Sequence, residues 1–168
     1  MRSRKFAMAA AFSVIVFSSK AFVPTPFKDS FIIVQALMLG LAGLMIAPLG
    51  ATLVSTISGL LIAGWSPSLA VFSIGFSVLY GVLLDTLLLV LRPQRGAGAV
   101  DARRFTAAVA LSTAVVGFVA YAVTLSLRLL PRNTVAEVAI LASGGVTGII
   151  GGYLGVVIWR RLASFVQE

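Results

Sequence analysis

Long apolar runs alternate with short polar segments along the whole chain. Each run is apolar on all faces rather than along one stripe, and helices of this kind belong in lipid. We therefore expect an all-α integral membrane protein, a compact bundle of six transmembrane helices that forms a single domain over residues 1–168. The expected helices are roughly residues 6–23, 30–47, 49–64, 68–91, 105–129 and 135–159.

An uncharged stretch over residues 36–64 lies at the centre of this pattern, and only Pro48 and Gly50 interrupt it strongly. Because proline breaks a helix interior but suits a first turn, we expect one helix to end near Ala47 and the next to begin near Leu49. Small residues recur at every fourth position in this second arm and in the last helix, which predicts close contact with neighbouring helices. These residues are Ala51, Ser55, Gly59 and Ala63, and then Gly144, Gly148 and Gly152.

The first run also has the features of a cleavable secretory signal, with a basic start and small residues towards its end. Cleavage would leave five of the six expected spans. We favour a retained first helix, because the rest of the chain is itself embedded in the membrane and needs no cleavable signal.

Charge supports a membrane location, because only 11% of the residues are charged, against about 25% in soluble domains. The net charge of +8 does not indicate nucleic-acid binding, since the basic residues flank the apolar runs. Of the 13 Lys and Arg residues, nine fall on the side of the N-terminus and four on the other. This asymmetry predicts a multi-pass protein of the cell (plasma) membrane with both termini in the cytoplasm. The nine are Arg2, Arg4, Lys5, Arg92, Arg95, Arg103, Arg104, Arg160 and Arg161; the four are Lys20, Lys28, Arg128 and Arg132.

Catalytic chemistry finds little support in the residues. The chain has no Cys and no His, which excludes thiolate chemistry and the usual zinc and haem ligands. No paired-carboxylate, G-x-S-x-G or phosphate-loop motif occurs, so we expect neither an enzyme nor a resident metal or cofactor. Asp85 lies inside an apolar run, and two interpretations stay open. It is an interface carboxylate paired with an arginine of the following loop, or part of a proton relay.

Polar and aromatic side chains gather at the outer helix ends, whereas the inner side carries mainly arginine. A pocket for a small aromatic molecule needs apolar walls, stacking rings and a few fixed donors and acceptors. Trp65 and Tyr121 can supply rings, and each candidate taken alone can also be a helix cap or an interface anchor. The candidate substrate-binding residues are Gln35, Trp65, Ser73, Tyr121, Thr124, Arg128, Asn133 and Glu137.

Several features together resemble the substrate-binding S component of an energy-coupling factor transporter. They are six short helices, an Ala-rich first helix, a proline-containing first outer loop over residues 23–30, and the hairpin GLMIAPLGATLVSTISGLL over residues 43–61. The resemblance covers most of the chain as a pattern of hydropathy and small residues.

The resemblance implies a binding protein for a vitamin or vitamin precursor, taken up from the outer side. Its implied partners are the substrate, one transmembrane coupling protein and two cytoplasmic ATPase subunits. Ala7 and Ala11 match the family's small-xxx-small motif that docks on the coupling protein, and residues 23–30 match its lid loop. The metal-binding branch uses an N-terminal histidine that this chain lacks, so the resemblance implies an organic substrate. Pyrimidine, thiazole, flavin and pterin rings all suit the candidate side chains.

Two other classes of protein also fit the sequence. A self-contained secondary carrier or channel would more typically show an inverted repeat and helices broken at the membrane midplane. A non-transport scaffold or assembly protein would have no pocket, and its outer aromatic and basic side chains would face lipid headgroups. The transporter subunit is the interpretation that accounts for the hairpin, the first helix and the outer side chains together.

Overall fold

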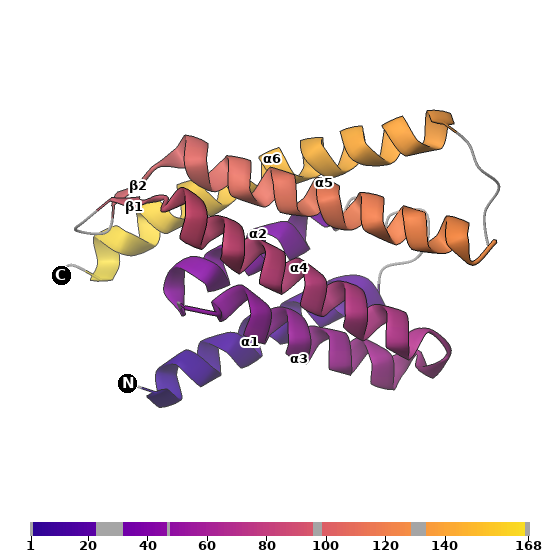
Figure 1. Cartoon of the computed structure of the whole chain (residues 1–168). Coiled ribbons are helices and arrows are strands. Elements are labelled where there is room, and N and C mark those ends of the chain that lie inside the picture. The colour runs from indigo at the N-terminus through magenta and orange to yellow at the C-terminus, as the bar shows by residue number, and fades with distance from the viewer. Residues whose placement is uncertain (1, 23–31, 47, 96–98, 129–133, 167–168) are drawn as a thin grey trace.

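The computed structural model describes residues 2–22, 32–46, 48–95, 99–128 and 134–166. Within them the chain is almost entirely helical, with one short antiparallel hairpin between α4 and α5 (Figure 1). The elements are α1 (Arg2–Ala21), α2 (Ile32–Met45), α3 (Gly50–Trp65), the 3-10 turn η2 (Pro67–Leu69), α4 (Ala70–Leu91), β1 (Gln94–Arg95), β2 (Ala99–Val100), α5 (Ala102–Ser126) and α6 (Thr134–Val166).

Several observed boundaries differ from the expected ones by a few residues, and three of the differences concern how the helices begin, connect and end. Leu49 adopts a left-handed backbone with φ of 84°, so α3 begins only at Gly50 and Pro48 lies outside it. The segment between α4 and α5 forms the β1–β2 ladder, in which Gln94 pairs with Val100, although a plain loop was expected. α6 continues to Val166, because arginine is a good helix former and ends only the apolar part of the helix.

Among the described residues, three helices are long and apolar enough to cross a membrane: α4, α5 and the Glu137–Leu162 part of α6. α2 and α3 are apolar but have only 14 and 16 residues. At 1.5 Å of rise per residue they are roughly 21 and 24 Å long, which is less than the roughly 30 Å hydrocarbon core of a bilayer. The structure is therefore that of a helical membrane protein in which short and long apolar helices pack together.

α2 is the central helix, and it contacts every other α-helix of the described chain. In Figure 1 it runs with α4 between the α5–α6 pair and the α1–α3 pair. Both chain ends and the β1–β2 hairpin lie at the same end of the bundle (Figure 1). We call this the terminal end, and we call the opposite end, where α5 leads into α6, the distal end. The α2–α3 connection also lies at the terminal end.

The predicted small-residue stripes are confirmed as packing surfaces. On α3, Gly59 lies against Ser77 of α4, and a Cβ added to Gly81 of α4 would lie 2.6 Å from the Cα of Thr52. The α6 stripe packs on α5 in the same way. Cβ atoms added at Gly144, Gly148 and Gly152 would lie 3.1, 2.5 and 2.9 Å from the Cα atoms of Ala114, Ala110 and Thr106. Both stripes are thus used inside the bundle.

Candidate functional site

The structure distributes the predicted substrate-binding residues over the distal parts of five helices. They are Gln35 on α2, Trp65 on α3, Ser73 on α4, Tyr121 and Thr124 on α5, Arg128 just after α5, and Glu137 on α6. Gln35 and Tyr121 are buried, Ser73, Thr124 and Glu137 are half-buried, and Trp65 and Arg128 are exposed. Asn133 and the expected lid over residues 23–30 lie outside the described residues.

Trp65 belongs to a cluster of three aromatic rings at the distal end. Its ring centroid lies 6.3 Å from that of Phe17 on α1 and 5.6 Å from that of Phe22, which follows α1. The two phenyl rings lie 6.2 Å apart in an edge-to-face arrangement. Such pairs stabilise by roughly 0.5–1.5 kcal/mol beyond the area that they bury. The cluster ties the end of α1 to the end of α3, while 59% of the Trp65 surface stays exposed.

Gln35 is the predicted residue whose surroundings most favour a ligand. Its side chain is only 6% exposed, in the first turn of α2. Its amide makes no hydrogen bond with the described part of the chain, although its NH₂ group can donate and its oxygen can accept. No fully enclosed side-chain N or O atom of the described residues lacks a partner, so the Gln35 amide keeps some contact with the surface, where a ligand can reach it. The Thr124 hydroxyl, in contrast, already donates to Tyr121 O of its own helix at 2.8 Å.

A shallow apolar groove lies at the distal end, but it takes in none of the predicted residues. Its lining comes from the exposed face of α6, namely Thr134, Val135, Val138, Ala139 and Ala142. A groove of this composition offers no stacking ring and no fixed polar group for an aromatic ligand.

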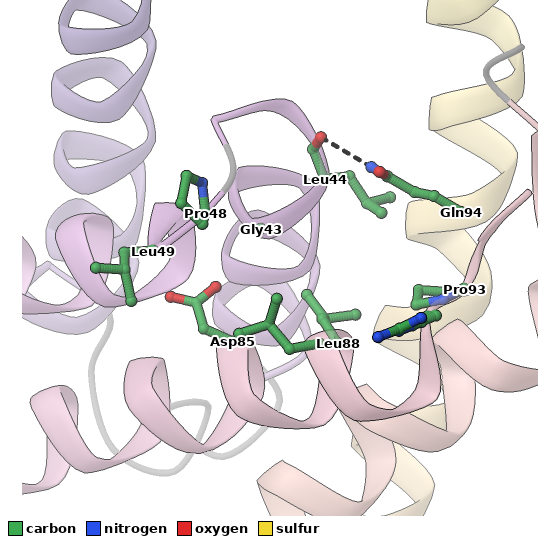
Figure 2. A pocket seen from close by; sticks show the side chains of 10 residues that line it. Gly43, Leu44, Pro48, Leu49, Asp85, Leu88, Pro93 and Gln94 are labelled. Carbon is green, nitrogen blue, oxygen red and sulfur yellow. Dashed lines mark hydrogen bonds between the residues drawn. The ribbon is translucent and has the colours of Figure 1, made fainter. Parts of the chain in front are cut away.

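A cavity of about 400 Å³ lies at the terminal end, where the sequence pattern predicts no pocket. It is bordered by the end of α2, the two residues just before α3, the last turns of α4 and the first residue of β1 (Figure 2). Its lining residues are Gly43, Leu44, Pro48, Leu49, Asp85, Leu88, Leu89, Arg92, Pro93 and Gln94.

Asp85 forms one wall of this cavity and binds the start of α3. Its Oδ1 accepts a hydrogen bond from Ala51 N at 3.2 Å, and its Oδ2 accepts from Thr52 N at 2.8 Å and from Thr52 Oγ1 at 2.6 Å. Leu49, at the N-cap position, has no side-chain oxygen, so α3 cannot cap itself. The carboxylate of α4 therefore does the work of an N-cap, and it is favoured by the positive end of the α3 dipole.

The arginine partner expected for Asp85 is not found among the described basic side chains. Asp85 is only 5% exposed, and its carboxylate faces the first turn of α3 (Figure 2). Among the side chains that the structure describes, Asp85 thus caps a helix and does not pair with an arginine of the following loop. The physical reason is that the otherwise unpaired N–H groups at the start of α3 lie within hydrogen-bond distance of the carboxylate.

The end of α2 is held by side chains from two distant segments. Lys5 Nζ of α1 donates to Ile46 O at 3.3 Å, and Gln94 Nε2 of β1 donates to Leu44 O at 3.2 Å (Figure 2). Terminal carbonyls of a helix have no intrahelical partner, and a cation there also complements the dipole. Both ends of the α2–α3 connection are therefore fixed by residues far away in the sequence.

Two features of the sequence indicate this arrangement when they are taken together. Asp85 is an acid inside an apolar run, and the helix that follows Pro48 starts without a capping residue. The sequence could not link Asp85 with Thr52, which is 33 positions away, without knowing that α3 and α4 run side by side. Comparison of the chain with family models, curated proteins and solved structures finds no match. The fold therefore defines the class, a small helical membrane protein.

Proposed function

We propose that this protein is the substrate-binding subunit of an uptake system for a vitamin or vitamin precursor. In this proposal all six helices span the cell membrane, both termini lie in the cytoplasm, and the distal end faces outward. A separate coupling protein and two ATPase subunits supply the energy, in keeping with the resemblance to S components. The short α2 and α3 are then accommodated by local thinning of the bilayer.

The buried amide of Gln35 is the observation that carries the proposal. It lies at the distal end of the central helix and lacks a hydrogen-bond partner within the described chain. A ligand with ring nitrogens or carbonyls would supply the missing partner. Tyr121, also buried, and Trp65 offer aromatic surfaces at the same end.

The exposed face of α1 supports the docking part of the proposal. Ala7 and Ala11 are both exposed, whereas the small-residue stripes of α3 and α6 are covered by α4 and α5. Close helix packing in lipid depends on such stripes. The α1 stripe is therefore open to a helix of another protein.

The location of the chain break argues against the self-contained carrier. Broken helices of secondary carriers meet near the membrane midplane, where they form the substrate site. Here α2 and α3 meet at the terminal end of the bundle (Figure 1). Asp85, Gln94 and Lys5 form hydrogen bonds with the backbone on the two sides of the connection between them. The backbone groups at these two helix ends therefore already bind side chains of the protein, rather than being free to bind a substrate.

Replacing Gln35 by leucine should weaken substrate binding without destabilising the protein. Loss of one hydrogen bond to the ligand raises the Kd about tenfold, whereas the described part of the chain makes no hydrogen bond with the Gln35 amide that the leucine would remove. Native mass spectrometry of the purified protein identifies any co-purifying molecule. Titration with thiamine, riboflavin and folate then measures the Kd, and thermal unfolding without ligand measures the stability.

Gln94→Leu is the matched control, because this amide lies at the terminal end and already binds Leu44 O. It should lower the stability by about 1 kcal/mol and leave the Kd unchanged. A wild-type protein that carries no small molecule and binds none of the three vitamins would contradict the proposal. So would a Gln35→Leu variant that binds as tightly as wild type.

Replacing both Ala7 and Ala11 by leucine should abolish docking and leave the isolated protein intact. Two leucines fill the flat stripe and keep a partner helix at a distance, yet both positions are exposed in the bundle. The tagged protein is purified from its own membrane in mild detergent, and ATP hydrolysis in the eluate is measured. Wild type should retain the activity and the double variant should lose it, at an unchanged melting temperature.

Ala139→Leu tests whether any added bulk on the lipid-facing surface has the same effect. Ala139 is exposed on α6, so this variant should retain the ATPase activity. Equal activity for all three proteins, or no ATPase activity with wild type, would argue for a protein that works without a coupling module.

A further inference from the structure

We propose that the cavity at the terminal end binds the headgroup of an anionic phospholipid, with Arg92 holding the phosphate. The cavity holds about 400 Å³, which is larger than a free phosphate needs and within the range of small-ligand sites. The proposal does not depend on the substrate-binding role of the distal end. It requires only that the bundle lies in a membrane.

Arg92 supplies the charge. Its side chain lines the cavity, and it makes no ion pair or side-chain hydrogen bond within the described residues. The nearby Arg104 differs, because it contacts Asp101 at 3.7 Å and donates to Leu91 O at 3.3 Å. A guanidinium presents parallel N–H donors that match two phosphate oxygens. Arg92 is thus the cavity's free anion-binding group.

The carboxylate of Asp85 in the same cavity does not oppose an anion as strongly as a free acid would. Three donors from Ala51 and Thr52 already bind its two oxygens, and the positive end of α3 lies against it. The negative charge of Asp85 is therefore offset by these donors and by the helix dipole, whereas no described ion pair or side-chain hydrogen bond offsets the positive charge of Arg92.

Backbone strain is concentrated at this cavity. Three described residues other than glycine have positive φ, and two of them, Leu49 at 84° and Arg92 at 43°, line it. Arg92 occupies the position after α4 where helices commonly end in glycine. Left-handed backbone at a bulky residue is costly, and such residues cluster at ligand clamps. The strain at Arg92 is explained if the side chain is needed there.

Apolar lining points to a lipid rather than to a free anion. Leu49 and Leu89 line the cavity and are 57% and 61% exposed, and Leu88 lies beside Asp85 in its wall (Figure 2). A wall of this kind can receive the upper part of an acyl chain while the phosphate contacts Arg92. Basic pockets between membrane helices on the arginine-rich side bind anionic headgroups by this principle.

The test uses the full chain in detergent with dioleoylphosphatidylglycerol, dioleoylphosphatidylcholine or inorganic phosphate added. Native mass spectrometry should show one retained phosphatidylglycerol, with phosphatidylcholine bound at least tenfold more weakly. Arg92→Gly should lower the affinity for phosphatidylglycerol about tenfold or more, and Arg92→Lys should have an intermediate effect. Without lipid, Arg92→Gly should melt at or above the wild-type temperature, because glycine relieves the left-handed backbone.

Arg103→Gly is the control at the same end, since Arg103 is exposed and does not line the cavity. It should retain the wild-type preference for phosphatidylglycerol. Equal retention of the two lipids, or a loss that is equal for Arg92→Gly and Arg103→Gly, would overturn the proposal. Stabilisation by inorganic phosphate equal to that by phosphatidylglycerol would overturn the lipid assignment and indicate a site for a free anion.

Discussion

Asp85→Ala is expected to lower the free energy of unfolding by about 2–4 kcal/mol, because it leaves a buried helix start without acceptors. The carboxylate is 5% exposed and accepts three hydrogen bonds from Ala51 and Thr52. Water that enters the adjoining cavity can replace these bonds only in part, because the residue is almost fully enclosed. The loss adds the desolvation cost of the orphaned N–H groups to the lost attraction of a negative charge for the α3 dipole. Equilibrium unfolding in mixed detergent micelles measures the change.

Asp101→Ala is a matched control for this prediction. Asp101 also caps a helix, and its Oδ1 accepts from Arg103 N at 3.1 Å and from Arg104 N at 3.4 Å at the surface. Because solvent can replace these bonds, the cost there should be about 1 kcal/mol. A stability loss at Asp85 no greater than at Asp101 would contradict the buried cap.

Asp85→Asn separates the charge of the residue from its shape. Its amide oxygen can accept from Thr52, but its NH₂ group would face the N–H of Ala51, so about half of the stability loss should remain. Full wild-type stability for this variant would show that the negative charge is not needed for capping. That outcome would favour the proton relay, in which Asp85 carries a proton for part of the time.

Gly81→Ala and Gly75→Ala, on the same helix, are expected to change stability in opposite directions. A Cβ at Gly81 would lie 2.6 Å from Thr52 Cα and 2.8 Å from Ala51 O, both backbone atoms that cannot rotate away. Overpacking of this kind costs roughly 1–3 kcal/mol and separates α3 from α4. A Cβ at Gly75 meets nothing within 4 Å, so alanine there should stabilise α4 by about 0.5–1 kcal/mol.

The same unfolding measurement, made on both variants, checks the sign as well as the size. Gly81 and Asp85 are one helical turn apart and touch the same first turn of α3, so their effects should couple. The double variant Gly81→Ala, Asp85→Ala should therefore lose less stability than the sum of the two. Stabilisation by both alanines, or simple additivity, would mean that α4 does not approach α3 as closely as described.

Local pattern determined much of the architecture. Uninterrupted apolar runs and the break at Pro48 predicted the helices and their order, because backbone groups in lipid must be satisfied within each helix. The four-residue spacing of Gly144, Gly148 and Gly152 predicted a close helix contact, since glycine permits backbone approach wherever the partner lies. The sequence also identified the exposed candidates Ala7 and Ala11 and the distal candidate Gln35, whose roles stay predictions.

Tertiary structure decided which residues meet. Several contacts join segments that are distant in the chain. They are the packing of α5 on the α6 stripe, the capping of α3 by Asp85, and the hydrogen bonds of Gln94 and Lys5 at the end of α2. Sequence periodicity places a side chain on a face of its own helix, but it carries no information on the rotation of that face towards another helix. The terminal cavity with Arg92 therefore became visible only once the helices were packed, because its walls come from four separate elements.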